Sequence, residues 1–245
     1  MSINWRSVPA RLLVTVIMIS GIASGTTITF VTPSGGATSD GSVNASAVFV
    51  TGPGTLTITL SDLLGNPTNV GQLLSNIEFS LSSSLSGSAS MSSSARERTV
   101  SSDQSFTEGA TVSTGWALQA FGGAGTIICV ICPNGGTPSP TTNPPPSHLI
   151  IGAGPYTSAN GSISGNGPHN AFLDETATFT ILDSRITSAS VASNIMFGFG
   201  TQFGSEVAGQ VAASASAVPE TNTMVLIGTG LILLGSFRRL VKTKS

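Results

Sequence analysis

The sequence predicts an all-β protein whose main domain is a single β-sandwich, with a jelly roll as one form that it could take. The first observation is a strict alternation of apolar and polar residues. Apolar residues at 56, 58 and 60 alternate with threonines, and Ala177, Phe179 and Ile181 do the same. Such a period of two buries one face of a strand. The second observation is that charged residues make up only 8% of a chain rich in Gly, Ser and Thr, which is typical of extracellular β-rich proteins.

Further strands follow from shorter runs of β-forming residues. We expect them at residues 27–31, 45–51, 77–81, 110–120, 126–131, 148–152 and 195–199. Gly52, Pro53 and Gly54 lie between two of the predicted strands and predict a hairpin turn. Residues 69–74 are expected to form one helical turn. The serine-rich stretch 82–94 leaves three interpretations open, namely an edge strand, a loop or a partly disordered segment.

The N-terminus has the pattern of a secretory signal peptide. Arg6 and Arg11 form a basic region, an apolar run follows Arg11, and small residues come next. We therefore expect residues 1–23 to be a signal peptide that is cleaved after Ala23, with Gly25 as the second choice. The alternative is a membrane helix that is retained.

The C-terminus combines a Val218-Pro219-Glu220 signature, an apolar run and a basic end. The run is expected to form a transmembrane helix over residues 223–241, long enough for a bilayer when the arginines within it snorkel. The alternative is a buried core helix that ends in a charged tail. This end is expected to stay in the cytoplasm because it carries four positive charges, at Arg238, Arg239, Lys242 and Lys244.

These three C-terminal features resemble the PEP-CTERM sorting signal of exported bacterial proteins. The resemblance covers residues 218–245, and it departs from the usual form at Thr221, where the family has a second proline. It implies recognition by an exosortase-type processing enzyme at Val218, Pro219 and Glu220, and an association with exopolysaccharide. It implies nothing about the activity of the preceding domain.

One exported domain is expected between the two signals, at residues 26–207. Because proline cannot donate to a sheet, the proline-rich stretch 133–147 is expected to be a surface loop, with an interdomain linker as the alternative. The small residues of 208–217 are expected to form a flexible tether. The exported part has three arginines, ten acidic residues and no lysine. Nucleic acid is therefore not expected as a partner, because phosphate binding requires clustered cations.

Cys129 and Cys132 are the two cysteines of the chain. In an exported protein this pair is expected to close a local disulfide at the entrance to the proline-rich stretch. Two alternatives stay open. The thiols could be unpaired, or they could serve a metal or redox site, although the first cysteine ends a β-like run and not the helix start typical of redox pairs.

The acidic residues and histidines that could bind a metal ion can also be explained as ordinary structural residues. Asp174, Glu175 and Asp183 are the densest group of carboxylates and suit calcium, but solvated ends of a strand are the favoured interpretation. His148 and His169 are expected to be loop residues, and no metal site is predicted.

Two further patterns bear on carbohydrate and on nucleophilic chemistry. Trp116 and Tyr156 would indicate a glycan-binding platform if they were exposed side by side. A displaced Gly-x-Ser-x-Gly pattern at 161–165 lacks the strand-to-helix setting of a nucleophile elbow.

The sequence therefore predicts a non-catalytic exported protein without a cofactor. We expect it to be anchored in the membrane through its C-terminal helix before processing, and to lie afterwards at the cell surface or in an extracellular matrix with exopolysaccharide. The alternative is an exported hydrolase or glycan-binding protein whose site is assembled from residues far apart in the sequence.

Overall fold

Fifteen strands and one short helix are present in residues 25–122, 125–133 and 146–213, which are the residues that the computed structural model describes. The chain divides into a unit up to Gln210 and a C-terminal segment, Val211–Ser245, of which only residues 211–213 are described. The strands are β1 (Thr27–Val31), β2 (Ala37–Thr38), β3 (Gly41–Ser42), β4 (Ala45–Gly52), β5 (Thr55–Asp62), β6 (Leu74–Leu81), β7 (Ser90–Val100), β8 (Phe106–Val112), β9 (Ala117–Phe121), β10 (Gly125–Cys129), β11 (Ile150–Ile151), β12 (Phe172–Leu182), β13 (Ala192–Phe199), β14 (Glu206–Ala208) and β15 (Gln210–Val211). The helix is the single 3-10 turn η1 (Val70–Gln72).

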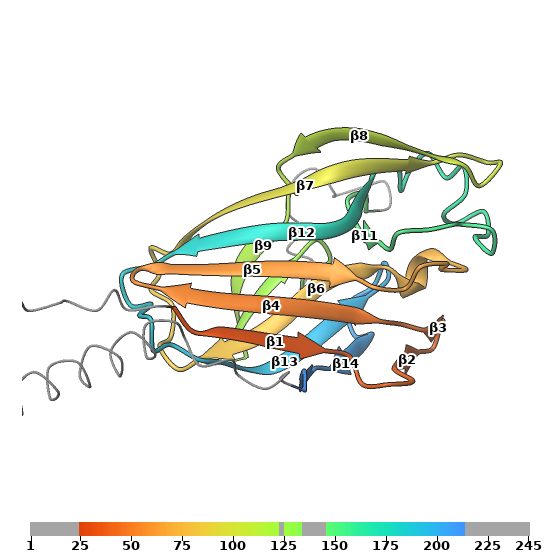
Figure 1. Cartoon of the computed structure of the whole chain (residues 1–245). Coiled ribbons are helices and arrows are strands. Elements are labelled where there is room, and N and C mark those ends of the chain that lie inside the picture. Colours follow the sequence, from red (N-terminus) through yellow and green to blue (C-terminus); the bar gives the residue numbers. More distant parts are fainter. Residues whose placement is uncertain (1–24, 123–124, 134–145, 214–245) are drawn as a thin grey trace, which may run out of the picture. The chain divides into compact units, whose positions relative to one another are not determined.

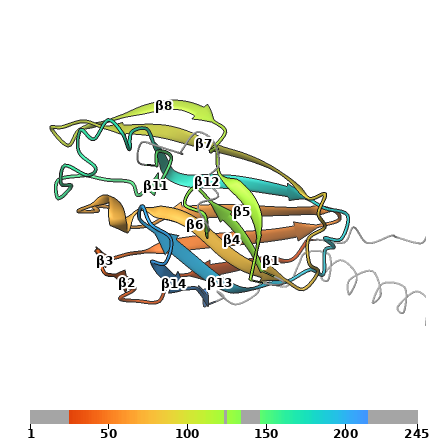
Figure 2. The same ribbon diagram turned by 180° about the vertical axis from the view of Figure 1, so that it is seen from behind.

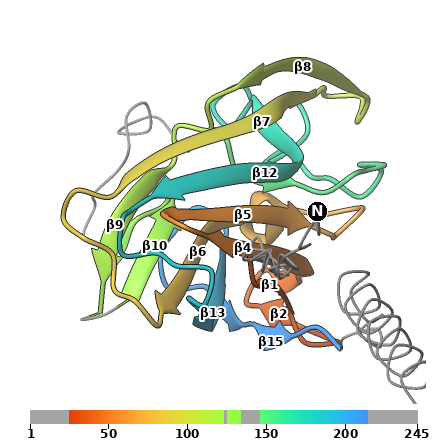
Figure 3. The ribbon, with the colours of Figure 1, turned by 60° about the vertical axis from the view of Figure 1, so that its left-hand side comes forward.

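The two halves of one large sheet face each other across a core, so the domain is all-β and sandwich-like. One half has the order β8-β7-β12-β5-β4-β1, seen at the front of Figure 1. The other half has the order β9-β10-β6-β13-β14. It lies toward the viewer in Figure 2, where the molecule is turned by 180° from the view of Figure 1. The short strand β11 joins the halves at one end, because it pairs with β12 in parallel and with β6 antiparallel. Figure 3 shows both layers together.

The core lies between these layers and follows the alternation in the sequence. Leu56, Ile58 and Leu60 of β5 are fully buried, as are the three apolar residues of β12 that alternate with threonines. β5 and β12 are paired, with Ile58 opposite Phe179. The ring of Phe49 contacts those of Phe30 and Phe79 edge to face, which is a geometry that aromatic pairs prefer. The prediction of one buried face for these strands is confirmed.

Most of the predicted strands are present, but the prediction of one strand at 110–120 is wrong. The turn at Gly52-Pro53-Gly54 joins β4 to β5, and the helical turn predicted at 69–74 is η1. The single strand expected at 110–120 is instead two strands, β8 and β9, in opposite halves of the sheet. Gly115 lies between them with a φ of 72°, a left-handed conformation that glycine adopts without strain and that a strand does not contain.

The serine-rich stretch 82–94 begins as a loop and ends inside a strand. β7 begins at Ser90 and pairs with both β12 and β8. Residues 134–145 of the expected proline-rich loop lie outside the described residues. β14 and β15 extend strand structure to Val211, into the stretch expected to be a tether.

Candidate functional site

The residues of the C-terminal signal lie outside the described part of the chain. This applies to Val218, Pro219 and Glu220, to the expected helix at 223–241, and to the charges at Arg238, Arg239, Lys242 and Lys244. The expected signal peptide, residues 1–23, lies outside it too. Among the described residues, no helix is long and apolar enough to span a membrane.

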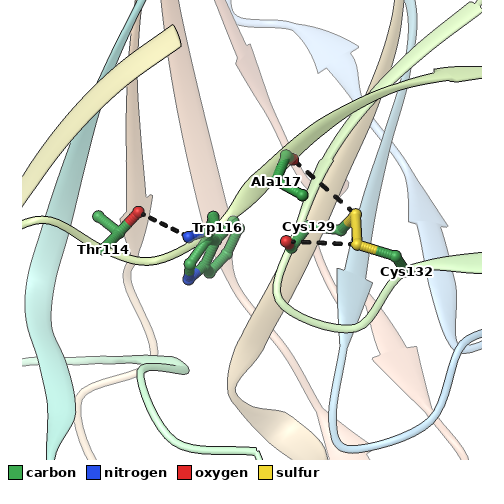
Figure 4. Close-up of a disulfide and its surroundings, with 5 residues drawn as sticks. All are labelled: Thr114, Trp116, Ala117, Cys129 and Cys132. Atoms are coloured by element: carbon green, nitrogen blue, oxygen red, sulfur yellow. Dashed lines mark hydrogen bonds between the residues drawn. A yellow bond between two sulfur atoms is a disulfide. The ribbon is translucent and has the colours of Figure 1, made fainter. Parts of the chain in front are cut away.

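Cys129 and Cys132 lie at disulfide distance, with their Cα atoms 5.2 Å apart (Figure 4). The bridge joins the last residue of β10 to the turn that follows. Both cysteines are buried and pack with Ile127, against the partly buried Ala117 and Phe121, in a small cluster separate from the main core. The geometry agrees with the predicted structural disulfide.

Trp116 and Tyr156 are buried, so they do not form an exposed platform for sugars. Trp116 is 5% exposed, and its ring nitrogen donates a hydrogen bond to the carbonyl of His148 over 2.9 Å. Tyr156 is fully buried and its hydroxyl donates to the carbonyl of Gly152. The pKa of Tyr156 is raised to about 12, chiefly by burial. Both rings act as core residues.

A buried arginine holds two carboxylates at the edge of the sheet. Arg98 of β7 is 4% exposed and lies opposite Glu108 of β8. Its Nε and Nη2 donate to Oε1 of Glu108 over 2.9 and 2.6 Å, and Nη2 also pairs with Asp174 of β12. Its Nη1 donates to the hydroxyl of Tyr156 over 2.7 Å and to the carbonyl of Gly152. We call Arg98, Glu108 and Asp174 the arginine cluster.

The arginine cluster is arranged as a structural clamp. Burial raises the pKa of Asp174, the nearby Arg98 opposes this shift, and the charge of Glu108 adds to it. The ring of Phe106 covers the guanidinium at 4.4 Å from its centroid. Both carboxylates therefore contact the same cation, which ties β7 to β8 and β12.

Asp183 does not lie beside Asp174 and Glu175, so the three acids considered for calcium form no common site. Asp174 lies near the start of β12 and Asp183 follows its end, so the length of the strand separates them. Glu175 is exposed as expected, but the prediction that Asp183 is solvated is wrong. It is 6% exposed and accepts hydrogen bonds from the backbone of Ser86 and Arg185. These bonds lower its pKa.

Both histidines lie in loops, as expected. Nε2 of His148 lies 3.2 Å from Oε1 of Glu97, and Nδ1 of the same ring lies 3.0 Å from the carbonyl oxygen of Thr114. Nδ1 of His169 lies 2.8 Å from the carbonyl of Pro146. Within the described residues, no group of three or more His, Cys, Asp or Glu side chains is placed to hold a metal ion.

A polar pocket of about 550 Å³ lies beside η1, and we call it the loop pocket. Segments 39–40, 69–71, 160–162 and 199–205 contribute its lining residues. Most of these carry hydroxyl or amide groups, and Asp40 carries the one carboxylate of the lining. The side chains of Asp40, Thr201 and Gln202 have no hydrogen-bond partner among the described residues, so they are available to a ligand.

Local structure shapes this pocket. The side chain of Asn69 accepts from Gly71 N over 2.8 Å and Gln72 caps the same turn in return, which fixes η1. A Cβ at Gly71 would overlap the carboxyl group of Asp40, so that group lies directly on this glycine. Gly200 has a φ of 81°, and a Cβ there would lie 3.1 Å from Gly71 Cα. The two glycines let the walls of the pocket approach each other.

No motif in the sequence points directly to these residues as a site. Of the pocket lining, residues 69–71 and Phe199 lie in predicted elements, but those predictions concerned structure and not binding. No pattern in the sequence distinguished Arg98, Glu108 or Asp40 from the other charged residues. A capping-box pattern at Asn69 and Gln72 was the one local signal that could have been read.

Comparison with known proteins adds no family assignment. No family model matches the chain, and no curated protein and no solved structure is significantly similar to it.

Proposed function

We propose that this chain is an exported, non-catalytic protein of the cell surface or extracellular matrix that holds a hydroxyl-rich polysaccharide in the loop pocket. In this proposal residues 1–23 direct export, and the PEP-CTERM-like tail at 218–245 directs sorting by an exosortase-type enzyme. The tail anchors the precursor through the helix at 223–241 until processing.

The observation that carries the proposal is the chemistry of the loop pocket. Its volume of about 550 Å³ is in the range of small-molecule sites, and its free groups are hydroxyls, amides and one carboxylate. Such groups donate to and accept from sugar hydroxyls, whereas the described lining has no cation that would favour an anionic ligand. A neutral, hydroxyl-rich ligand fits best.

The arrangement of the carboxylates supports a role without catalysis. Glycoside hydrolysis uses two carboxyl groups that face each other across the substrate. The loop pocket contributes one, that of Asp40, and the pair Glu108 and Asp174 is held by Arg98. Burial of Trp116 and Tyr156 supports a pocket that binds sugars by hydrogen bonds and not by ring stacking.

Affinity electrophoresis tests this proposal. The full chain would be run through gels containing purified exopolysaccharide of the native host, beside Asp40→Asn, Gln202→Ala and the control Glu175→Gln. We expect retardation of the wild type and the control, and a loss of at least about threefold in affinity for the two pocket variants. Asp40→Asn replaces charge-assisted hydrogen bonds to the ligand by weaker neutral ones, and Gln202→Ala removes its hydrogen bonds. Glu175 is exposed and is not among the residues that line the pocket, so Glu175→Gln removes the same charge as Asp40→Asn without changing the lining.

Two results would count against the proposal. Equal mobility of the wild type in gels with and without polysaccharide would remove the binding role. Release of new reducing ends from the polysaccharide, lost in Asp40→Asn, would instead support the alternative of an exported hydrolase.

A further inference from the structure

The outer face of the β10-β6-β13-β14 layer carries a row of side chains in register. In an antiparallel sheet, directly paired residues point to the same face. Asn76 of β6 pairs with Gly198 of β13, which pairs with Glu206 of β14. Ile77, Phe79 and Phe197, which alternate with these residues, are buried in the main core, so the row lies on the opposite face. Glu78 follows Asn76 on that same face.

Asn76 is an unpartnered buried amide within this row. Its side chain is 1% exposed, and neither Oδ1 nor Nδ2 has a hydrogen-bond partner in the part of the chain that the structure describes. A buried polar group without a partner costs about 1–3 kcal/mol. A Cβ at Gly198 would overlap both amide atoms, so the amide lies over Gly198, on the side of Glu206. The missing side chain at 198 makes room for it there.

Two carboxylates near this amide have no cation to balance them. The pKa of Glu78 is raised to about 7. Burial is the larger cause, and the negative charge of Glu206 adds to it. None of the ion pairs in the described residues includes Glu78 or Glu206, and lysine is absent from residues 25–213. Oε1 of Glu206 accepts from Gly204 N, which leaves its other oxygen for a further contact.

We propose that Glu78, Glu206 and the Oδ1 atom of Asn76 bind a divalent cation of the Ca²⁺ type on this outer face. Ca²⁺ binds carboxylate and amide oxygens, tolerates irregular geometry and completes its shell with water. The cation balances both carboxylates and gives Asn76 the partner that the described chain does not provide. Zinc fits less well, because this row has no nitrogen ligand of the histidine type and Cys129 lies at disulfide distance from Cys132.

This cation site shares no residue with the loop pocket and does not rest on the proposed polysaccharide binding. Its residues come from the outer face of β6 and β14, whereas Asp40 and Gln202 line the pocket. A failure of one proposal therefore leaves the other intact.

Calorimetric titration of the full chain with CaCl2, after removal of metals with EDTA, tests the site. We expect binding of one Ca²⁺ per chain and a rise in the unfolding midpoint that grows with Ca²⁺ concentration. Glu78→Gln and Glu206→Gln should each lower Ca²⁺ affinity at least about tenfold, because each removes a charged ligand. The control Glu175→Gln removes an exposed acid of β12 and should leave the affinity unchanged.

A second measurement reports on Asn76 directly. In NMR spectra of the wild type, the side-chain NH2 signals of Asn76 should shift on Ca²⁺ addition and reach saturation together with the calorimetric signal. Gly198→Ala should displace the amide and weaken Ca²⁺ binding, while retained near-ultraviolet circular dichroism would show that the core is intact. The proposal is overturned if up to about 10 mM Ca²⁺ leaves the wild type unchanged, or if both glutamine variants bind Ca²⁺ as tightly as the control.

Discussion

Asp62 ends β5 on the core side of the sheet, where its carboxyl group is 2% exposed. Oδ1 accepts the backbone N–H of Leu64 over 2.9 Å, but Oδ2 has no hydrogen-bond partner among the described residues. Burial raises the pKa of Asp62 well above its ordinary value, and the bonds from backbone N–H groups only partly oppose this. The folded state therefore binds a proton at Asp62 more tightly than the unfolded chain does.

The sign of the resulting pH dependence follows from linkage. With a raised pKa in the folded state, the stability from Asp62 is fully present below the ordinary carboxyl pKa and is lost as the pH rises through the folded pKa. Over that interval the free energy of unfolding should fall by up to about 1.4 kcal/mol per pH unit. Asp62→Asn keeps an acceptor for Leu64 without a charge, so it should abolish this slope. Urea unfolding at several pH values checks it, and parallel curves for the two proteins would contradict it.

Phe179 shows how one face of a strand carries most of its stability. The side chain is fully buried, and its ring lies 5.3 Å from that of Trp116. Phe179→Ala should lower the free energy of unfolding by about 3–5 kcal/mol, because it removes contacts and leaves a cavity. Thr178→Ala, on the half-buried opposite face, should cost less than about 1 kcal/mol. Equal costs in urea denaturation would show that the register of β12 is wrong.

Among the elements, the hairpin β7–β8 depends on charge more than on apolar packing. β8 carries mostly exposed or half-buried residues and pairs with β7 alone. The arginine cluster adds a buried ionic connection to the backbone pairing of β7 with β12, and it is a buried side-chain link that includes a residue of β8. The outer edge of the layer should therefore open before the core does.

Arg98→Met tests this connection. The substitution leaves the partly buried Glu108 and Asp174 without their cation and should cost about 3 kcal/mol. Hydrogen exchange should accelerate more in β8 than in β5, because β8 contributes Glu108 to the cluster and β5 contributes no residue to it. Arg96→Met on the same strand is the control, since that side chain is 54% exposed and should contribute less than about 1 kcal/mol. Equal losses for the two variants would show that the cluster is no clamp.

The end of β10 depends on the disulfide. Intact protein taken from the oxidising compartment should be lighter by two hydrogen atoms than the reduced form, because Cys129 and Cys132 are joined. Replacing both by serine should cost at most about 2 kcal/mol, since the closed loop is short. Mass spectrometry with and without reduction checks the bond, and complete alkylation of both cysteines without reduction would refute it.

The strands that the sequence predicted are those whose own side chains specify a buried face. β5 and β12 alternate threonine with large apolar residues, so their period was visible in isolation. The first half of β7 was left open among a strand, a loop and a disordered segment, because serine and charged residues dominate this strand. Neighbours on both sides stabilise it. The break between β8 and β9 depends on one left-handed glycine, Gly115, in a run that otherwise favours a strand.

At the scale of the whole molecule, both candidate sites arise from topology. The loop pocket joins four segments, and the proposed cation site joins Asn76 to Glu206 across β13. Apart from the capping box at Asn69 and Gln72, no local pattern in the sequence distinguishes the residues of either site. The reverse holds for the tail, whose residues form a recognisable pattern in the sequence but lie outside the described structure.

Processing of the tail is the prediction that concerns the whole chain. If an exosortase-type enzyme acts near Pro219 and Glu220, the mature protein should lack residues 224–245 and should leave the membrane fraction or become attached to another envelope component. Pro219→Ala combined with Glu220→Ala should block this step and leave a full-length precursor in the membrane. Intact-mass measurement of the protein from its native host distinguishes the two forms.

Topology and recognition should be separable in this tail. Arg238 and Arg239 follow the apolar run, and positive charge keeps the adjacent end of a membrane helix in the cytoplasm. Replacing both by glutamine should therefore weaken retention of the C-terminus without altering the Pro-Glu signature. Protease accessibility of a C-terminal epitope measures this effect independently of cleavage. A wild-type protein that keeps its full-length tail, unaffected by the Pro219 and Glu220 substitutions, would make this segment a plain membrane anchor, because the apolar run and the positive charges would then account for its behaviour without a processing signal.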